Sequence, residues 1–389
     1  MADIDTLNML QASLAMGLKQ IKNQIEDEDY APILMLGKAG IGKTESVANL
    51  AKEMGIGFTE LRLTIYQESD LIGLPKIEDG VTKHYPSTVL PPQDDKGQGI
   101  LFFDEVTSAP RNMRTAVLQL MDSSRKLGEY VLPPKWMIVC AGNGPDDGGD
   151  FEGLEPAFLN RGVAFRVEPN LDDWKAWAVQ SGVHPTVVAY LSWRPEDLHV
   201  MDIDKPSDLI ASPRSWNKLS KQLKMYEKNS KGGIIENDDE VVFCSSICVG
   251  AKVGPQFAAF YRYNRHTINT SDILEGKADP KAIVNVDDQI VYITAQNVIH
   301  LLVKSVKENK ADTESTVNDK CLNQICNTLR WVVNAYAAGM KMDVAVEIIS
   351  GLAKGVKGIE TIIMSEALAE KCPEFDDFIM ANRKAINLF

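Results

Sequence analysis

Early in the chain stands the segment Gly37-Lys38-Ala39-Gly40-Ile41-Gly42-Lys43-Thr44, which fits the pattern G-x-x-x-x-G-K-[S/T]. The apolar run 33–36 before it predicts a buried strand, and residues 45–52, which begin with Glu45, predict a helix. Glycines at this spacing let the backbone wrap a phosphate and direct its N–H groups inward, and the start of the helix adds positive potential there. In this pattern Lys43 reaches the β- and γ-phosphates of a nucleotide, and Thr44 ligates Mg²⁺.

A second motif supports this interpretation over its alternative, a glycine-rich turn followed by a chance Lys-Thr pair. The apolar run 99–103 leads directly into Asp104 and Glu105. An apolar run without alternation suits a strand that is buried on both faces of a parallel sheet. Open α/β sheets bind their ligands at the carboxyl ends of such strands. We therefore expect Asp104 to hold the Mg²⁺ ion and Glu105 to act as general base on the attacking water.

The composition fits a globular protein of two or three domains and sets limits on its partners. The chain has 389 residues, of which 44% are hydrophobic, and a net charge of −13, which argues against a general nucleic-acid binder. The cysteines show no paired C-x-x-C spacing, so free thiols in a reducing compartment are expected. The acidic N-terminus lacks an apolar signal region and no apolar run approaches a membrane span, which favours a cytoplasmic protein without a membrane partner.

The pattern of elements changes near Pro169. Before it, strands and helices alternate, which is typical of a parallel sheet covered by helices. An amphipathic helix is expected over residues 7–25, and Asp79-Gly80 predicts a hairpin. After it the chain is mostly helical, with a linker-like stretch at 266–280. We therefore predict an α/β nucleotide-binding domain at 1–169, a helical lid at 170–265 and a C-terminal helical region at 266–389.

Three further polar residues are candidates for the site, and each has a plainer interpretation. Asn143 follows the apolar run 136–141 and could contact the γ-phosphate or the attacking water, but strand-end turns commonly carry asparagine. Arg161 could stabilise charge on the transferring phosphoryl group, although an arginine near a helix end is usually solvated. Arg214, just after Ser212-Pro213, could sense phosphate or could be a surface residue in a first helical turn.

Together these residues resemble the AAA+ ATPases, and among them the MoxR-like family, over roughly residues 5–265. The phosphate loop and the segment ending in Asp104-Glu105 match the two Walker motifs, and Asn143 resembles sensor 1. Residues 154–161 are similar to the family segment that ends in the arginine finger, here Arg161. Residues 211–214 resemble the sensor 2 segment, and residues 70–73 resemble a piece that precedes a hairpin insert.

Two positions depart from the family pattern. The finger segment reads Asn160-Arg161-Gly162 where the family has Asp-Arg-Phe, and a glycine separates Asn143 from Pro145 where the family has Asn-Pro. Arg166 lies close to Arg161, so either arginine could act on a neighbouring subunit. The region after about residue 270 resembles no family that we can name.

The resemblance implies a ring, commonly a hexamer, that binds ATP and Mg²⁺ at each subunit boundary. Residues Gly37–Glu45, Asp104, Glu105 and Asn143 would act within one subunit, and Arg161 would come from the next. Arg214 would bind the phosphate end and couple hydrolysis to movement of the lid. The resemblance also implies a client protein, with a separate von Willebrand A domain protein as one candidate.

Three functional hypotheses follow. The first is a cytoplasmic, ring-forming, MoxR-like ATPase and chaperone that remodels a partner protein or complex. The second is a nucleic-acid motor or restriction-type NTPase with the same core, which the acidic balance and the lack of a basic cluster with aromatics weigh against. The third is a nucleotide-gated scaffold whose C-terminal helices do the binding.

Overall fold

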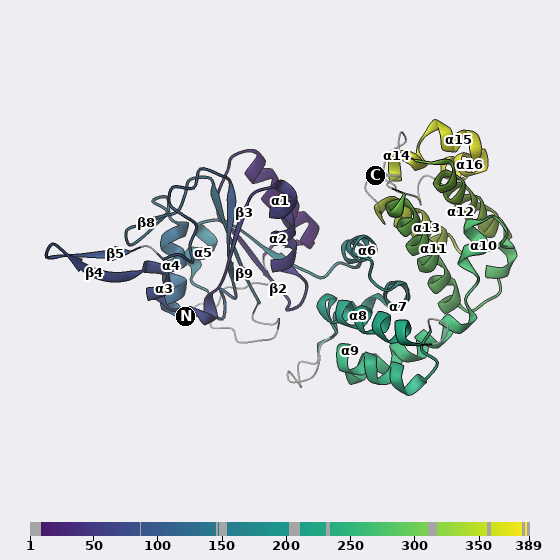
Figure 1. Cartoon of the computed structure of the whole chain (residues 1–389), viewed down its shortest axis with the longest axis horizontal. Coiled ribbons are helices and arrows are strands. Elements are labelled where there is room, and N and C mark those ends of the chain that lie inside the picture. The colour runs from purple at the N-terminus through teal and green to yellow at the C-terminus, as the bar shows by residue number, and fades with distance from the viewer. Residues whose placement is uncertain are drawn as a thin grey trace. The chain divides into compact units, whose positions relative to one another are not determined.

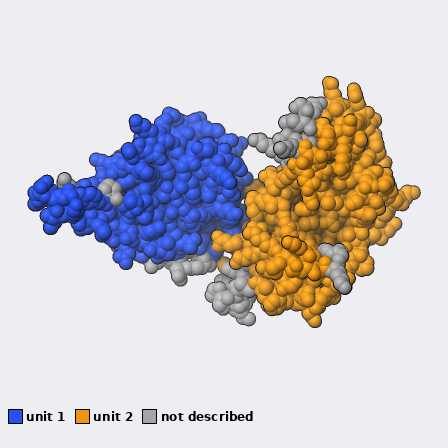
Figure 2. Space-filling model, viewed as in Figure 1, with its two compact units in different colours: residues 1–170, 203–206 blue, residues 171–202, 207–389 orange. Residues whose placement is uncertain are grey.

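The computed structural model describes residues 9–85, 87–144, 147, 154–201, 211–230, 234–309, 317–355, 359–382 and 386. These residues form two compact units, one ending at Asn170 and the other beginning at Leu171 (Figure 2). The first unit is an α/β domain, and the second is almost entirely helical (Figure 1).

The first unit is built on a six-stranded parallel sheet with the order β1-β10-β2-β9-β6-β3. Its strands are β1 (Gln11–Ala12), β2 (Ile33–Gly37), β3 (Gly57–Arg62), β6 (Gly99–Asp104), β9 (Trp136–Gly142) and β10 (Val163–Val167). Two hairpins pair β4 (Leu74–Glu78) with β5 (Val81–Tyr85), and β7 (Lys126–Leu127) with β8 (Tyr130–Val131). The parallel sheet and the hairpin at Asp79-Gly80 confirm those two predictions.

Helices cover both faces of this sheet because successive strand residues point to opposite sides. On one face Ile33 and Met35 of β2 pack with α1 (Leu14–Glu26) and α2 (Lys43–Met54). On the other face Leu34 and Leu36 belong to the cluster that holds α4 (Arg111–Met121) and Phe158 of α5 (Pro156–Asn160) (Figure 1). Both sets are fully buried, as the unbroken apolar strands predict. The short helix α3 (Glu68–Ile72) and the 3₁₀ turn η2 (Leu63–Ile65) complete the unit.

One expectation for this unit was wrong, and two of its strands were not expected. The helix expected over 7–25 begins only at Leu14, where the Ser13 hydroxyl accepts a hydrogen bond from the Met16 N–H as an N-cap. Leu10 is 75% exposed outside the helix, and Leu7 lies outside the described residues. Strands β1 and β10 were not expected at all. They extend the sheet beyond β2, so the phosphate-loop strand is interior rather than at an edge.

In the part of the second unit that the structure describes, there are helices α6 to α16 and the 3₁₀ segments η3, η5 and η6. The longer helices are α6 (Leu171–Gln180), α7 (Pro185–Trp193), α8 (Pro213–Asn229), α9 (Asp238–Tyr261), α11 (Asp288–Glu308), α12 (Asp319–Ala338), α13 (Met342–Gly355) and α16 (Pro373–Ala381). The shorter pieces are η3 (Pro195–Leu198), η5 (Arg262–His266), α10 (Thr270–Leu274), η6 (Pro280–Ile283), α14 (Ile359–Ile363) and α15 (Glu366–Lys371). The stretch 266–280 is therefore no simple linker, and Ile273 within it is fully buried.

The core of this unit consists of two hydrophobic clusters that interlock. One contains the aromatic residues Tyr190, Trp216 and Phe257, and the other spans the helices from α10 to α16. Ile293 of α11 belongs to the first cluster, and Val179 of α6 packs against the second. The C-terminal helices thus complete the core of the helices that precede them. The division into a lid and a C-terminal region at about residue 265 stays a prediction.

Among the residues that the structure describes, one helical stretch is long and apolar enough to cross a membrane by length and composition alone. It runs from Asp238 to His266, through α9 and η5, and 56% of its apolar window is buried inside the protein. Gly250 breaks it, with φ 88° and ψ 161°. Since core helices of soluble proteins pass the same test, it is weak evidence for a membrane span.

Candidate active site

The phosphate loop joins β2 to α2, and its backbone has the shape that the glycines predict. Gly40 and Gly42 have φ values of 79° and 92°, a region that favours glycine. A Cβ on Gly37 would lie 2.3 Å from the carbonyl oxygen of Val167 in β10, so no side chain fits there. Ile41 is only 7% exposed and anchors the loop in the core. The loop is therefore held in a defined curve at the N-terminus of α2.

Lys43 lies over this loop. Its side chain is buried, and its ammonium Nζ donates to the carbonyl oxygens of Gly37 at 2.6 Å and Lys38 at 3.1 Å. The positive charge thus sits at the concave side of the loop, at the start of a twelve-residue helix. Glu45 is exposed in the first turn of that helix, where a carboxylate suits the helix dipole.

Thr44 and Asp104 meet beside Lys43. The Thr44 hydroxyl donates to Oδ2 of Asp104 at 2.9 Å, and Oδ1 of Asp104 accepts the backbone N–H of Glu105 at 2.9 Å. A hydroxyl and a carboxylate at this distance are the hard oxygen ligands that Mg²⁺ prefers. The pair therefore fits a magnesium ion, as the two sequence motifs predict. Among the described residues no group of three or more His, Cys, Asp or Glu side chains is arranged for another metal.

Glu105 has an unusual backbone and is held by one residue at the end of the neighbouring strand β3 and one in the turn η2 that follows it. Its φ is 58°, which is uncommon outside glycine and is found at functional sites. Thr64 donates its hydroxyl to Oε2 of Glu105 at 2.5 Å, and Arg62 Nε lies 3.6 Å from Oε1. The carboxylate is 41% exposed, so water can reach it. Sequence reasoning missed Thr64 and Arg62, because the contact depends on β3 lying next to β6.

Asn143 follows β9, the strand that lies between β2 and β6. Its backbone N–H donates to Oγ1 of Thr107 at 3.0 Å, and Thr107 is fully buried. A Cβ on Gly142 would lie 2.7 Å from both Oγ1 and Cγ2 of Thr107, so the strand end is tightly packed. Asn143 therefore follows the strand between β2 and β6, the two strands that carry the motifs, and lies at the carboxyl edge of the sheet with them. Thr107 is another site residue that sequence reasoning did not find.

The two candidate arginines differ sharply in their surroundings. Arg161 caps α5 with its side chain 34% exposed, and its Nη2 lies 3.4 Å from Oδ2 of Asp122. Arg166 in β10 is only 6% exposed, with Nη2 2.5 Å from Asp147 Oδ1 and Nε 2.7 Å from Glu168 Oε1. Of the two, Arg161 is therefore the more accessible to solvent.

The glycine after Arg161 also has a structural reason. A Cβ on Gly162 would lie 2.2 Å from the carbonyl oxygen of Pro32, which accepts the N–H of Val163 at 2.8 Å. The departure from the Asp-Arg-Phe pattern therefore follows from the close approach of the chain to the start of β2.

Arg214 belongs to the second unit and is described within it. It is exposed in the first turn of α8. Ser212 caps this helix by accepting the N–H of Ser215 at 3.3 Å, and Ser215 Oγ in return accepts the N–H of Ser212 at 2.7 Å. The turn that carries Arg214 is thus well defined, while a role in phosphate sensing stays a prediction.

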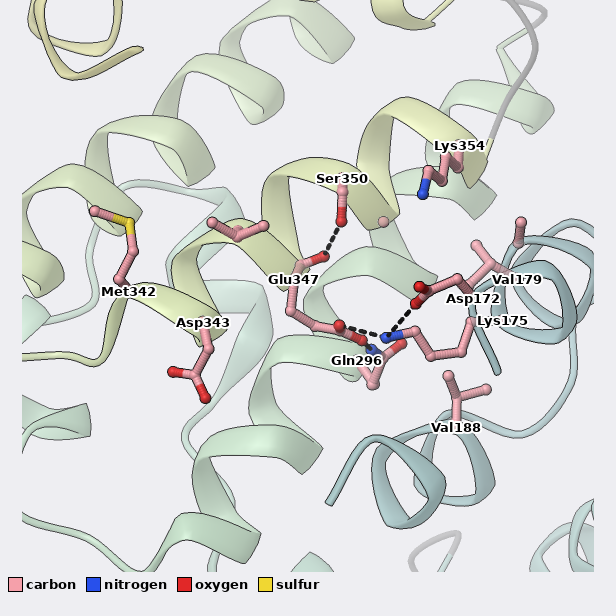
Figure 3. A pocket seen from close by; sticks show the side chains of 13 residues that line it. Asp172, Lys175, Val179, Val188, Gln296, Met342, Asp343, Glu347, Ser350 and Lys354 are labelled. Atoms are coloured by element: carbon pink, nitrogen blue, oxygen red, sulfur yellow. Dashed lines mark hydrogen bonds and ion pairs between the residues drawn. The ribbon is translucent and has the colours of Figure 1, made fainter. Parts of the chain in front are cut away.

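The second unit also holds a cavity of about 520 Å³ between α6 and α13, floored by α7 and α11 (Figure 3). Glu347 of α13 is the centre of its polar wall. Its carboxylate accepts from Lys175 at 2.5 Å, from Gln296 at 2.6 Å and from Ser192 at 3.0 Å. These donors come from three different helices, so Glu347 joins α13 to α6, α7 and α11.

The parallel sheet, the phosphate loop and the acidic strand end define a P-loop nucleotide-binding fold. Residues 32–161 match the family model of the AAA domain, dynein-related subfamily. Residues 32–161 are therefore an AAA domain, which confirms the predicted AAA+ fold of the nucleotide-binding unit.

Solved structures similar to this chain include a RuvB mutant from Thermotoga maritima and NtrX from Brucella abortus. The RuvB match has 12% identity and a TM-score of 0.35, and it covers 81% of this chain and 86% of that chain. The NtrX match has 15% identity and a TM-score of 0.36, and it covers 87% of this chain and 68% of that chain. Likenesses at this level carry no argument about function.

Proposed function

We propose that this protein is a ring-forming, MoxR-like AAA+ ATPase that hydrolyses ATP at subunit interfaces to remodel a partner protein or complex. One observation carries the proposal. The Thr44 hydroxyl and the Asp104 carboxylate, from two separate motifs, lie 2.9 Å apart beside Lys43. This is the pairing that the two motifs predict for a nucleotide with its magnesium ion.

The chemistry of the described residues suits ATP and magnesium. The N–H groups of the loop from Gly37 to Thr44 would face the phosphates, and the Lys43 ammonium would exchange its bonds to loop carbonyls for bonds to phosphate oxygens. Thr44 and Asp104 would hold the magnesium ion. When bound, that ion supplies charge neutralisation and Lewis acidity at the phosphates.

Glu105 would act on the water molecule that attacks the γ-phosphate. As a carboxylate at the strand end it can accept a proton and orient the water. Asn143, leaving the sheet between the two motif strands, would hold the same water or the γ-phosphate.

Arg161 would complete the site of a neighbouring subunit. Its partial exposure supports this role, and the burial of Arg166 in two ion pairs argues against Arg166. An arginine supplied in this way accelerates phosphoryl transfer by about 10³ to 10⁵. The isolated monomer should therefore be almost inactive, and a ring, by family resemblance a hexamer, should be the active form.

Arg214 and the helices around it would respond to the nucleotide and pass motion to a client. We place the protein in the cytoplasm, with a client protein as its partner and a separate von Willebrand A domain protein as one candidate. The net charge of −13 supports a protein client rather than nucleic acid.

The test compares Glu105→Gln with the control Glu60→Gln, which changes an exposed carboxylate of β3. Glu105→Gln should bind ATP in the presence of Mg²⁺, as calorimetry would measure, but turn it over at least about 100-fold more slowly. The control should match the wild type. Wild-type turnover in Glu105→Gln would remove Glu105 from its role, and no magnesium-dependent binding to the wild type would end the proposal.

A mixing experiment tests the shared site. Lys43→Ala and Arg161→Ala subunits should each be inactive alone. In a mixture, the intact site of an Arg161→Ala subunit meets the Arg161 of a Lys43→Ala neighbour, so part of the activity should return. Absence of rescue at every ratio would argue against a trans arginine.

A further inference from the structure

A chain of charges, buried at its centre, links β10 to both sides of the candidate active site. Arg166 is opposite Leu36 in the register of β10 and β2, one residue before the phosphate loop begins. Its guanidinium contacts Asp147 at 2.5 Å and Glu168 at 2.7 Å. Asp147 is fully buried and Arg166 is 6% exposed.

One end of the chain holds the backbone just after Asn143. Oδ2 of Asp147 accepts the N–H of Gly144 at 2.7 Å, while its Oδ1 accepts from Arg166. A Cβ on Gly144 would lie 2.6 Å from Oδ2 of Asp147 and 3.1 Å from Nη1 of Arg166. The ion pair therefore packs against this backbone, which accounts for a glycine where the family pattern has proline.

The other end reaches the phosphate loop. Glu168 accepts from Arg166 through Oε1, and its Oε2 lies 3.6 Å from Nζ of Lys38. Lys38 is the second residue of the loop, and its carbonyl accepts from Lys43. A continuous series of polar contacts thus runs from Lys38 to Gly144, with Arg166 at its centre.

A buried ion pair is poor evidence of a stability role, because apolar residues of similar volume often stabilise as well or better. The contribution of Arg166 is instead to fix the positions of its partners. Its planar fork holds two carboxylates in fixed directions, which a lysine cannot do. The two carboxylates in turn hold the segment that carries Asn143 and the loop that would bind phosphate.

We propose that Arg166 is a positioning residue that acts within its own subunit, fixing Asn143 relative to the phosphate loop through Asp147 and Glu168. This inference rests on the proposed ATPase function. It differs from the alternative in which Arg166 acts on the neighbouring subunit. Gly144, Asp147 and Glu168 take part in the same positioning of Asn143.

The first test is a double-mutant cycle between Arg166→Met and Asn143→Ala. Arg166→Met should lower kcat roughly 10- to 100-fold, the cost of misplacing a catalytic group by about 1 Å. The Kd for ATP should change by less than about threefold, and Arg166→Lys should restore part of kcat because it keeps one contact. In the Asn143→Ala background, Arg166→Met should cost little more. Wild-type kcat in Arg166→Met, or full additivity with Asn143→Ala, would overturn the proposal.

A second variant keeps the test decisive where Arg166→Met does not fold. Gly144→Ala removes no charge but forces the Asp147–Arg166 pair away from the backbone. It should lower kcat about tenfold, while Gly97→Ala, in an exposed loop where a Cβ meets only the flexible Asp95 side chain, should not. Equal kcat in both glycine variants would contradict the proposal.

A mixing experiment separates the cis role from a trans role. Arg161→Ala mixed with Glu105→Gln should regain activity, since each Arg161→Ala site meets an intact neighbouring arginine. Arg166→Met mixed with Glu105→Gln should regain none, and rescue there would overturn the cis assignment. If wild-type protein has no turnover, or if the Arg161→Ala mixture is not rescued, the proposed function or ring fails instead, independently of Arg166.

Discussion

The Thr44 hydroxyl donates a hydrogen bond of 2.9 Å to Oδ2 of Asp104, across sixty residues of sequence. Thr44 is the second residue of α2, and Asp104 is the last residue of β6. The two motif strands are separated in the sheet by β9, so only a parallel arrangement with matched carboxyl ends brings these side chains together. The contact is therefore a consequence of sheet order as well as of the motifs.

The first prediction concerns the hydroxyl of Thr44. Thr44→Val keeps the shape of the side chain but removes one oxygen ligand, so turnover should fall at least about 100-fold. Thr44→Ser keeps the hydroxyl and should stay within about threefold of the wild type. Magnesium titrations of ATPase activity would measure both. Equal magnesium dependence in the valine and serine variants would show that Thr44 is not a ligand.

The second prediction concerns the hydrogen bond from Thr64 to Glu105. A carboxylate that accepts a hydrogen bond from a hydroxyl, with 2.5 Å between the two oxygens, has fewer lone pairs free for water. Thr64→Val should release it and raise basal turnover by about two- to fivefold, with the Kd for ATP unchanged. Thr64→Ser should behave as the wild type. A steady-state assay at saturating ATP would decide, and a slower valine variant would mean that Thr64 orients Glu105 productively.

Sequence patterns predicted those parts of the fold that depend on local apolar runs. The strands at 33–36, 99–103 and 136–141 were expected, because each is a continuous apolar segment buried on both faces. Strand β10 was missed because Arg166, its fourth residue, interrupts its apolar run. That charge is tolerated only because Asp147 and Glu168 meet it, and such tertiary contacts leave no local signal.

In the candidate site, too, local patterns were predictable from sequence and tertiary contacts were not. The motifs predicted the convergence of Lys43, Thr44 and Asp104, because their spacing encodes one loop and one strand end. The contacts of Glu105 with Thr64 and of Asn143 with Thr107 depend on which strands are neighbours. Strand order follows from long-range packing, so these partners could not be read from the residues alone.

The third prediction concerns the carboxylate that joins four helices in the second unit. Glu347→Ala would leave Lys175 without its closest anion and Gln296, which is 3% exposed, without an acceptor. Breaking one partner of a largely buried pair costs about 3 kcal/mol of unfolding free energy. Urea unfolding would measure the loss. Glu370→Ala, an exposed change on α15, should cost less than about 0.5 kcal/mol, and an equally small cost for Glu347→Ala would contradict the prediction.

The fourth prediction concerns His300 of α11. The pKa of His300 is lowered from 6.5 to about 4, mainly by burial. Smaller contributions come from Lys224, His184, Lys304 and Lys307. Between pH 6.5 and pH 4 the unfolded chain therefore binds more protons at this residue than the folded chain does. The stability contributed by neutral His300 is fully present above pH 6.5 and is lost as the pH falls towards 4.

Replacement of His300 should remove this pH dependence. His300→Gln cannot be protonated, so its unfolding free energy should fall less steeply than that of the wild type between pH 6.5 and pH 4. The difference in slope should approach about 1.4 kcal/mol per pH unit, the limit for one proton. His266→Gln, at an exposed histidine of η5, is the matched control and should leave the wild-type slope unchanged. Because many carboxylates titrate in the same range, only the difference in slope between wild type and variant is informative. Parallel curves of unfolding free energy against pH would show that His300 is protonated as readily in the folded chain as in the unfolded one.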